Sequence, residues 1–570
     1  MRIKKNKDKK ITGTELRECW NLIRPWWVSE EKWVARGLFL LVFTLDMGIV
    51  AIGAWLSYWN KNFFNAFTDY NIDQVWRLML QALLIAACGI TAEASRTWFY
   101  QTLQIKWRRW VTEVYMKGWL SKAAFHRIES NHEIDNADQR ISEDLKQMVD
   151  LSLHLSLGFF ANLCKLVTYS MIIWSLSGPL SFVLFGLNIN IPGYMLWVSI
   201  IYAFIASVVM EKWGRKMVAV EYEQQLRESD FRFMMMRIRE NSTQIAISHG
   251  EESERSMLKK LFSRIEHNWD FIKLYTRRIT VVEKGYTELG ILLAYLLIIP
   301  RYFARQITLG SIMQLTMSFT NVRVGFAWFV FQYKRLTSLR SMCRRLSELY
   351  NCINADYNSN IDFDTNTEDQ IRVSNLTMSL ADGSLITKID SLDISKGSKW
   401  LIKGKSGAGK TTFLKALAGI WQYGKGQISL PQANMMFLPQ EPYLPLGNLR
   451  AALCYPNSSE TYPLDECRIA LEKCGLGQYC EIIDNDDENW HKKLSPGEKQ
   501  RLAFARCLLT KPDFLFLDEA TSAMDPELEE RVFLTLVNEL DKTSIISVAH
   551  RQSMEKYHDN VLNISNFCAT

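Results

Sequence analysis

The chain has 570 residues, enough for more than one domain, and carries 67 basic and 61 acidic residues, a net charge of only +6. So small an excess gives no reason to expect a nucleic-acid partner. Its eleven cysteines form no CxxC pair and have no His-rich neighbours, so we predict reduced thiols, with neither a disulfide framework nor a cysteine-held metal.

The N-terminal segment is basic and then amphipathic. It lacks the apolar run of a signal peptide, so we predict that residues 1–33 form a cytoplasmic tail and an interfacial helix. Tryptophan favours headgroup depth in a membrane, and a soluble packing helix is the alternative. The residues that share one helical face are Leu16, Cys19, Trp20, Ile23 and Trp27.

Residues 34–345 contain long apolar segments, and a span needs roughly 20 such residues. We predict an all-α transmembrane bundle with six spans. They lie near Val34–Trp55, Val75–Trp98, Leu151–Trp174, Ile191–Met210, Val281–Pro300 and Leu315–Phe331. Basic residues after the second and fourth spans place those connections, 99–150 and 211–280, in the cytoplasm together with both chain ends. Their helical patterns predict that they continue the spans.

Four carboxylates fall inside or at the edges of these spans: Asp46, Glu93, Glu283 and Glu288. Charges at this depth are costly and commonly face a protein interior or a water-filled path. A role with cargo or a proton is one reading, and a polar contact between helices is another.

The pattern changes after residue 345. A polar stretch over 351–360, followed by acidic residues to Asp369, predicts a linker over 346–370. Strands then alternate with helices over 371–570, which predicts a soluble α/β domain.

A phosphate loop lies early in that domain. It follows a short predicted strand, Lys399–Lys403, and precedes a predicted helix. Its glycines let backbone N–H groups turn toward phosphate oxygens, and the helix N-terminus adds positive potential. Lys410 would reach the β- and γ-phosphates and Thr411 a Mg²⁺ ion. A glycine-rich turn that binds nothing is the alternative. The candidate residues are Gly404, Lys405, Ser406, Gly407, Ala408, Gly409, Lys410, Thr411 and Thr412.

Two further segments predict that the nucleotide bound at this loop is hydrolysed. An apolar strand ends in Asp518 and Glu519, which predicts a carboxylate for the Mg²⁺ shell and a second one that polarises the attacking water. Upstream, Ser495 and Gly497 start a predicted helix and form a second anion-binding end.

These segments resemble ABC proteins (ATP-binding cassette proteins). Leu494–Arg501 resembles their signature, with Pro496 and Glu498 in place of Gly and Gln. The resemblance implies roles for Gln440 in the Q-loop, where it also reaches the metal, and for His550 as the switch histidine. It also implies a D-loop at Ser522–Asp525. Leu380 stands where an aromatic residue often stacks on adenine, so apolar contact is the expected substitute.

The resemblance implies an ATPase of the α/β P-loop class that binds ATP and Mg²⁺, with Glu519 and His550 catalytic. Thr411, Gln440 and Asp518 would hold the metal. Cassettes of this family join head to tail, with each nucleotide between one phosphate loop and the other signature. A chain with one cassette and six spans is therefore expected to be a half-transporter that pairs with a second copy.

The membrane half resembles a narrower group, which contains SbmA/BacA-like and YddA-like bacterial proteins and the peroxisomal fatty-acyl transporters. The matching segments are Trp59–Ala66, Asn136–Asp144 and Ile307–Gln314. We expect an ATP-driven transporter in a bacterial inner membrane, contacting lipid and moving a solute, possibly peptide-like. Lipid-like cargo is one alternative, and an ATP-gated regulatory protein without net pumping is another.

Overall fold

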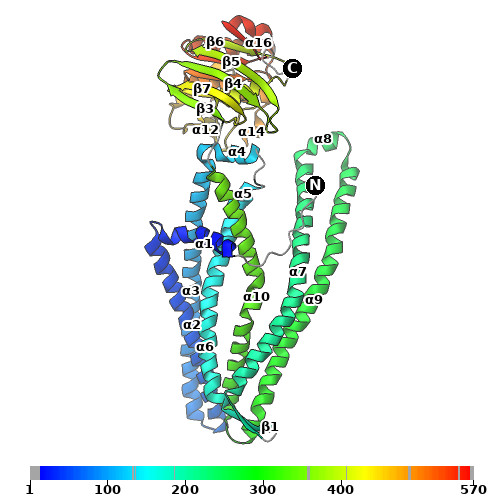
Figure 1. Ribbon diagram of the computed structural model, residues 1–570. Helices are drawn as coiled ribbons and strands as arrows, with labels where there is room; N and C mark the ends of the chain where they lie inside the picture. Colours follow the sequence, from blue (N-terminus) through cyan, green and yellow to red (C-terminus); the bar gives the residue numbers. More distant parts are fainter. Residues whose placement is uncertain are drawn as a thin grey trace. The chain divides into compact units, whose positions relative to one another are not determined.

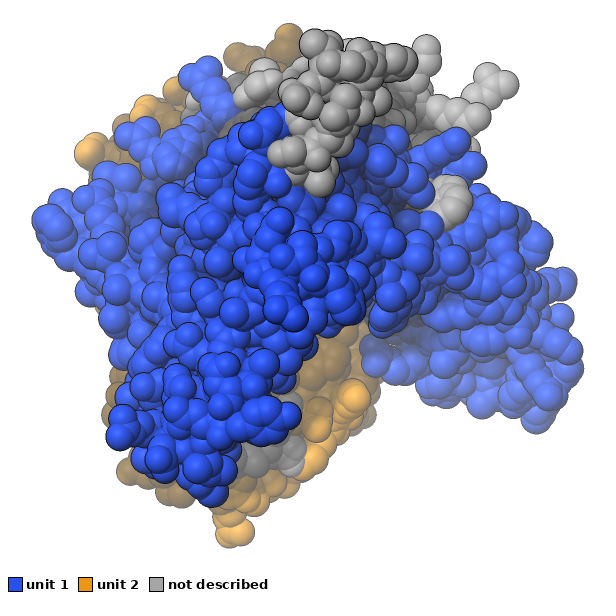
Figure 2. All heavy atoms as spheres, turned by 90° about the horizontal axis from the view of Figure 1, so that it is seen from below, with its two compact units in different colours: residues 1–354 blue, residues 355–570 orange. Residues whose placement is uncertain are grey.

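The computed structural model describes residues 13–130, 134, 136–184, 187–355, 360–405, 407–485, 489–549 and 552–564. The contacts divide the chain into two compact units, residues 1–354 and 355–570 (Figure 2).

Six helices of 33 residues or more make up most of the described part of the first unit (Figure 1). They are α2 Lys32–Thr68, α3 Ile72–Leu120, α6 Leu145–Ser177, α7 Tyr194–Glu240, α9 Glu251–Phe303 and α10 Leu309–Ile353. Short helices connect them: α1 Gly13–Val28, η1 Ser121–Ala123, α4 Ala124–Ser130, α5 Ala137–Gln139, η2 Arg140–Asp144 and α8 Ser242–Ile247.

The long helices differ in the length of their apolar stretches. Within the described residues, three helical stretches are long and apolar enough to cross a membrane, namely Lys32–Thr68, Ile72–Ser130 and Ala137–Ser177. A shorter apolar stretch covers Tyr194–Met210. The other long helices overlap the remaining predicted spans, but charged residues such as Glu288 and Arg323 interrupt their apolar stretches.

The helices α7 and α9 form a long hairpin with α8 at its tip (Figure 1). At the opposite end of the hairpin, β1 Pro179–Leu184 pairs antiparallel with β2 Leu187–Pro192. The expected helical span from Ile191 is wrong at its start, because Ile191 lies in β2 and α7 begins at Tyr194. The strict alternation of apolar residues and asparagine over Leu187–Ile191 is the period of a strand, not of a helix.

The amphipathic N-terminal segment forms α1, and Cys19, Ile23 and Trp27 of the predicted face pack against the buried cluster that contains Trp107. Trp26 is fully buried and stacks on Trp107 of α3, with ring centroids 5.4 Å apart, whereas Trp20 is exposed. The partner on α3 therefore sets which side of α1 packs. Its place at a membrane surface remains a prediction.

The polar elbow around Asn136–Asp144 packs against α10. The Arg140 guanidinium pairs with the Glu348 carboxylate at 3.3 Å. Asp144 pairs with Arg345 at 2.6 Å. Two ion pairs thus attach this segment to one helix.

Of the carboxylates expected in the spans, only Asp46 is buried, and it pairs with Arg96 of α3 at 3.0 Å. This contact favours the reading of Asp46 as a polar link between helices. Glu93, Glu283 and Glu288 are exposed on the single chain.

The second unit contains two sheets. The first is parallel, with the strand order β11 Asn560–Asn563, β6 Lys399–Lys403, β10 Ser544–Val548, β9 Phe514–Asp518 and β8 Met435–Leu438. The second has the order β3 Ile361–Asn366, β7 Gly424–Pro431, β4 Gln370–Ser379 and β5 Leu385–Ser395. Because α10 reaches Ile353 and β3 starts at Ile361, regular structure covers much of the expected linker 346–370. The domain boundaries stay predictions.

Helices complete this unit. They are α11 Lys410–Leu417, α12 Leu449–Cys454, α13 Leu464–Lys473, η3 Gly477–Tyr479, α14 Trp490–Lys493, α15 Pro496–Thr510, α16 Pro526–Glu539 and η4 Gln552–Tyr557. Phe413 of α11 is buried with Phe514 and Phe516 of β9 in one apolar cluster. This packing fixes the phosphate-loop helix to the strand that ends in Asp518.

Candidate nucleotide-binding site

The predicted site residues follow the carboxyl ends of neighbouring parallel strands. The phosphate loop follows β6, Gln440 follows β8 and Glu519 follows β9. In the sheet, Val548 of β10 lies between Ile402 and Asp518. Because parallel strands end at a common edge, residues more than 100 positions apart meet there, as ligand-binding groups do in open α/β sheets.

Two glycines shape the phosphate loop. Gly407 and Gly409 have φ angles of 81° and 90°, a region that side-chain-bearing residues rarely adopt. A Cβ on Gly409 would also lie 2.6 Å from Ile386 Cγ2. The loop therefore turns tightly into α11, whose N-terminal N–H groups are free to face an anion.

Lys410 lies at the centre of the loop. Its ammonium donates to the carbonyl oxygens of Gly404, at 2.9 Å, and Lys405, at 3.3 Å, and the side chain is buried. The backbone N–H of Ala408 donates to the Lys405 carbonyl at 3.2 Å, which closes the turn. The positive charge is thus held inside the loop, where phosphates are expected.

Thr411 joins the loop to the adjacent carboxylate strand. Its hydroxyl donates to Asp518 Oδ1 at 3.1 Å. Burial, together with the charge of Glu519, raises the pKa of Asp518, while this hydrogen bond and the nearby lysines oppose the shift. A positive ion beside Asp518 would relieve the cost of its buried charge.

Gln440 and Glu519 form a second polar contact at this edge. Gln440 Nε2 donates to Glu519 Oε2 at 3.4 Å. Glu519 has φ of 47°, a left-handed conformation uncommon for a residue with a side chain, and its N–H donates to the Val548 carbonyl. Thr411, Asp518 and Gln440 carry hydroxyl, carboxylate and amide oxygens, the types of ligand that suit Mg²⁺.

Not every candidate residue is described. Ser406 and His550 lie outside the described residues. Thr412 is the third residue of α11.

The signature segment forms the N-terminus of α15. Ser495 is its N-cap, Pro496 occupies the first turn, and Glu498 completes a capping box. Glu498 Oε2 accepts from the Ser495 N–H at 2.9 Å and from its hydroxyl at 2.8 Å, and Tyr479 donates to Oε1 at 2.9 Å. Burial opposes ionisation, but these donors hold the pKa of Glu498 below its usual range.

Gly497 lies against the D-loop. A Cβ there would approach the Ala523 carbonyl oxygen to 2.9 Å. Ser495 therefore contacts Glu498 and Gly497 contacts the D-loop, whereas Thr411 contacts Asp518. The signature residues and the phosphate-loop residue thus have separate contacts.

One residue that the sequence did not single out links these segments. Gln500 of α15 is buried, and its side chain hydrogen-bonds the backbone of Gln440 and Ala523 and the hydroxyl of Ser522. The sequence feature that could have pointed to Gln500 is its position two residues after the signature glutamate, Glu498.

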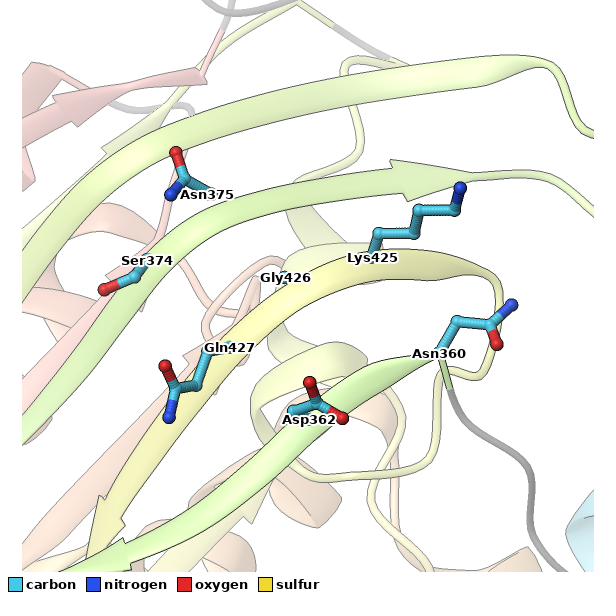
Figure 3. A pocket seen from close by; sticks show the side chains of 7 residues that line it. All are labelled: Asn360, Asp362, Ser374, Asn375, Lys425, Gly426 and Gln427. Carbon is cyan, nitrogen blue, oxygen red and sulfur yellow. The ribbon is translucent and has the colours of Figure 1, made fainter.

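Two surface features lie outside this constellation. Leu380, expected where an aromatic often meets adenine, follows β4 and is 47% exposed, so its apolar surface is available. A hollow of about 700 Å³ lies on β3, β4 and β7, and Figure 3 shows the residues that line it. Polar residues such as Asp362, Lys425 and Gln427 line it, and it includes no phosphate-loop residue.

Comparisons with known proteins agree with this geometry. Residues 22–303 match the family described as ABC transporter transmembrane region 2, and residues 387–522 match the family described as ABC transporter.

Two relatives are similar along nearly their full length. The inner membrane ABC transporter ATP-binding protein YddA of Escherichia coli (strain K12) is 30% identical over 549 residues, covering 95% of this chain and 96% of that protein. The lysosomal cobalamin transporter of Homo sapiens is 26% identical over 585 residues, covering 95% and 92%.

A solved structure of a bacterial Atm1-family ABC exporter with ATP bound matches with a TM-score of 0.74 at 18% identity and covers 94% of both chains. The expected fold, a helical transmembrane region followed by an α/β ATPase domain, is confirmed. So is the expected ATP hydrolase coupled to transport. This chain belongs to the ABC transporter family and carries a membrane domain and an ATPase domain in one polypeptide.

Proposed function

We propose that this chain is one half of a homodimeric, ATP-driven transporter of a bacterial inner membrane, with its ATPase domain in the cytoplasm. The basic residues after the second and fourth predicted spans favour this orientation. The printed name of YddA places that relative in an inner membrane.

The division of contacts within the ATPase domain carries the proposal of a dimer. The Thr411–Asp518 and Gln440–Glu519 contacts assemble one face of a phosphate site. Ser495 instead bonds Glu498, and Gly497 abuts Ala523. A second copy in head-to-tail orientation would bring its Ser495 and Gly497 to the phosphates, and two-fold symmetry would complete two equivalent sites.

The chemistry follows from the positions at the strand ends. Lys410, the loop N–H groups and Thr412 bind the phosphates, and Leu380 packs against adenine. Glu519 accepts a proton from the attacking water and His550 supports the transferring phosphate. Thr411, Asp518 and Gln440 would hold Mg²⁺, which neutralises phosphate charge when bound.

For cargo, we propose a hydrophilic, peptide-like solute. Within the predicted spans, Glu93, Glu283 and Glu288 are exposed on the single chain. Carboxylates at this depth favour a hydrated path over an apolar groove. The human relative is named for cobalamin, a further hydrophilic solute. Lipid-like cargo is the alternative.

The test uses the full chain in proteoliposomes with Glu519→Gln and a matched surface change, Glu539→Gln. Glu539 lies on α16 and pairs with Lys473 at 2.6 Å. We expect Glu519→Gln to lose at least 100-fold in ATP turnover and to accumulate ATP-bound dimers, while Glu539→Gln resembles the parent. Wild-type turnover in Glu519→Gln would show that Glu519 is not the base.

A second measurement separates pumping from gating. A transporter shows cargo-stimulated ATPase activity and ATP-dependent accumulation of a peptide mixture or cobalamin against a gradient. A regulatory protein shows ATP binding without accumulation. Because Glu519→Gln retains ATP but not turnover, accumulation by that variant would contradict hydrolysis-driven transport.

A further inference from the structure

Gln500 is a buried amide that hydrogen-bonds three groups from two other segments. Its Nε2 donates to the Gln440 carbonyl at 3.0 Å and to the Ser522 hydroxyl oxygen at 3.2 Å. Its Oε1 accepts from the Ala523 N–H at 3.0 Å. The side chain is only 3% exposed. One residue of α15 thus holds the Q-loop and the D-loop together.

The partners fix the orientation of this amide. A carbonyl oxygen can only accept and a backbone N–H can only donate, so Nε2 must face Gln440 and Oε1 must face Ala523. Leucine would make none of these bonds, and an ionised glutamate could accept from the Ala523 N–H and the Ser522 hydroxyl but could not bond the Gln440 carbonyl. A buried polar group that loses its partner is costly, so the arrangement resists rotation of either loop.

The linked segments serve different ATP sites in the proposed dimer. The side chain of Gln440 contacts Glu519 at 3.4 Å in the site of its own chain. Gln500 itself lies on α15, whose first residues would meet the nucleotide of the other chain in that dimer, and Gly497 abuts the Ala523 carbonyl. A displacement of Gln440 is therefore transmitted through the Gln500 amide to both Ala523 and the N-terminus of α15.

We propose that Gln500 is a positioning residue that couples the two ATP sites, an inference that rests on the proposed dimer. It touches neither the nucleotide nor the reacting atoms in this scheme. ATP bound at one phosphate loop shifts Gln440, and Gln500 passes the shift to the Ser495 and Gly497 end that closes on the second ATP. Removing the amide would uncouple the sites while leaving the phosphate loop intact.

The experiment compares the parent with Gln500→Leu in nanodiscs. The matched control is Gln427→Leu, the same change at an exposed position of β7. Three quantities are measured: the Hill coefficient and kcat of ATP hydrolysis, the affinity for a fluorescent ATP analogue without Mg²⁺, and the Tm. For two coupled sites the parent coefficient lies at about 1.5–2.

We expect Gln500→Leu to lower the Hill coefficient to about 1 and kcat at least tenfold, with analogue affinity within twofold of the parent. Gln427→Leu should change none of these. A parent-like Hill coefficient in a folded Gln500→Leu protein would overturn the inference. So would a loss of analogue affinity together with a fall in Tm, because the residue would then have a merely structural role. A parent that hydrolyses ATP without cooperativity would contradict the dimer as well.

Two further variants keep the test decisive if leucine prevents folding. Ser522→Ala removes one acceptor at little change in volume and should lower the coefficient partially. Gln500→Glu carries a buried carboxyl group that donates only when protonated. Its kcat relative to the parent should rise as the pH falls from 8 to 6, and a constant ratio would overturn a role for the Gln440 bond.

Discussion

The Thr411 hydroxyl donates to Asp518 Oδ1 at 3.1 Å, across 107 positions of sequence. The contact joins the helix after the phosphate loop to the end of β9. Both oxygens are ligands of the kind that Mg²⁺ prefers.

Thr411→Val tests this pair. Valine has a similar shape but no oxygen, so we expect the Mg²⁺ concentration for half-maximal ATPase activity to rise about 10- to 100-fold. The control is Thr535→Val on α16, whose hydroxyl bonds only the Arg531 carbonyl of its own helix. Titration of MgCl₂ at fixed ATP measures the effect, and an unchanged midpoint would remove Thr411 from the metal site.

Asp518→Asn should stabilise the protein while abolishing its activity. Burial raises the pKa of Asp518 above that of an unfolded aspartate, so above the folded pKa the ionised carboxylate opposes folding. Asparagine removes that charge. We therefore expect Tm at pH 7, without Mg²⁺ or nucleotide, to rise by about 2 °C. The gain should shrink as the pH falls through the folded pKa and vanish below the unfolded one.

Asp513, which lies just before the same strand, supplies a control in which the Asp→Asn substitution should change Tm in the opposite direction. Its hydrogen bond from Lys396, at 2.7 Å, holds the pKa of Asp513 below its usual range. Its carboxylate therefore favours folding above the unfolded pKa, and this contribution is lost as the pH falls through the folded one. Asp513→Asn should lower Tm at pH 7. Equal shifts in both variants would contradict the burial argument.

Glu498→Gln restores the usual signature residue and should strengthen ATP-driven closure. The hydrogen bonds to Ser495 and Tyr479 keep Glu498 ionised at neutral pH. In the proposed dimer that carboxylate lies close to the phosphates bound by the partner, and like charges repel. We expect the ATP concentration for half-maximal activity to fall about 3- to 10-fold, close to 1 kcal/mol.

Glu466→Gln is the matched control for that variant, because Glu466 lies on the exposed first turn of α13. Steady-state ATPase kinetics measure the change. If both variants keep the parent midpoint, the Glu498 carboxylate does not face a phosphate in the closed dimer.

The sequence located the candidate site because its segments lie at the ends of strands or begin just after them. A glycine pattern identified the loop, and an apolar run ending in two acids identified Asp518 and Glu519. The parallel sheet then brings the strand ends together without further information. The predicted roles of the individual residues remain to be tested.

Contacts between distant, unpatterned residues were not predictable in this way. Gln500 lies inside a helix, and its three bonds depend on how two loops fold over it. Trp26, which the helical-face pattern did not include, is buried because it stacks on Trp107 of α3. In each case the deciding partners lie at least 22 residues away in the chain, beyond the range of a helical or strand period.

The meeting of two resemblance segments is a further contact of this kind. Asn65, in the stretch Trp59–Ala66, accepts from the Gly310 N–H at 3.0 Å with its Oδ1. Gly310 belongs to the stretch Ile307–Gln314. The two segments therefore join the C-terminal end of α2 to the start of α10. Glycine at position 310 permits the close approach of the two helices.

Gly310→Ala should destabilise the membrane unit. An added Cβ would lie 1.9 Å from the Lys61 carbonyl oxygen and 2.7 Å from Asn65 Oδ1. The first of these is backbone, so α2 and α10 must separate. Overpacking of this kind costs about 1–3 kcal/mol, which predicts a Tm lower by roughly 5 °C.

Gly285→Ala in α9 is the control, because a Cβ there meets nothing within 4 Å. Alanine is the better helix former by about 1 kcal/mol, so this variant should melt at or slightly above the parent temperature. Tryptophan fluorescence during heating in detergent measures both. Asn65→Ala cannot rescue Gly310→Ala, since the closer clash is with the Lys61 backbone. Parent-like melting of Gly310→Ala would mean that α2 and α10 do not approach this closely.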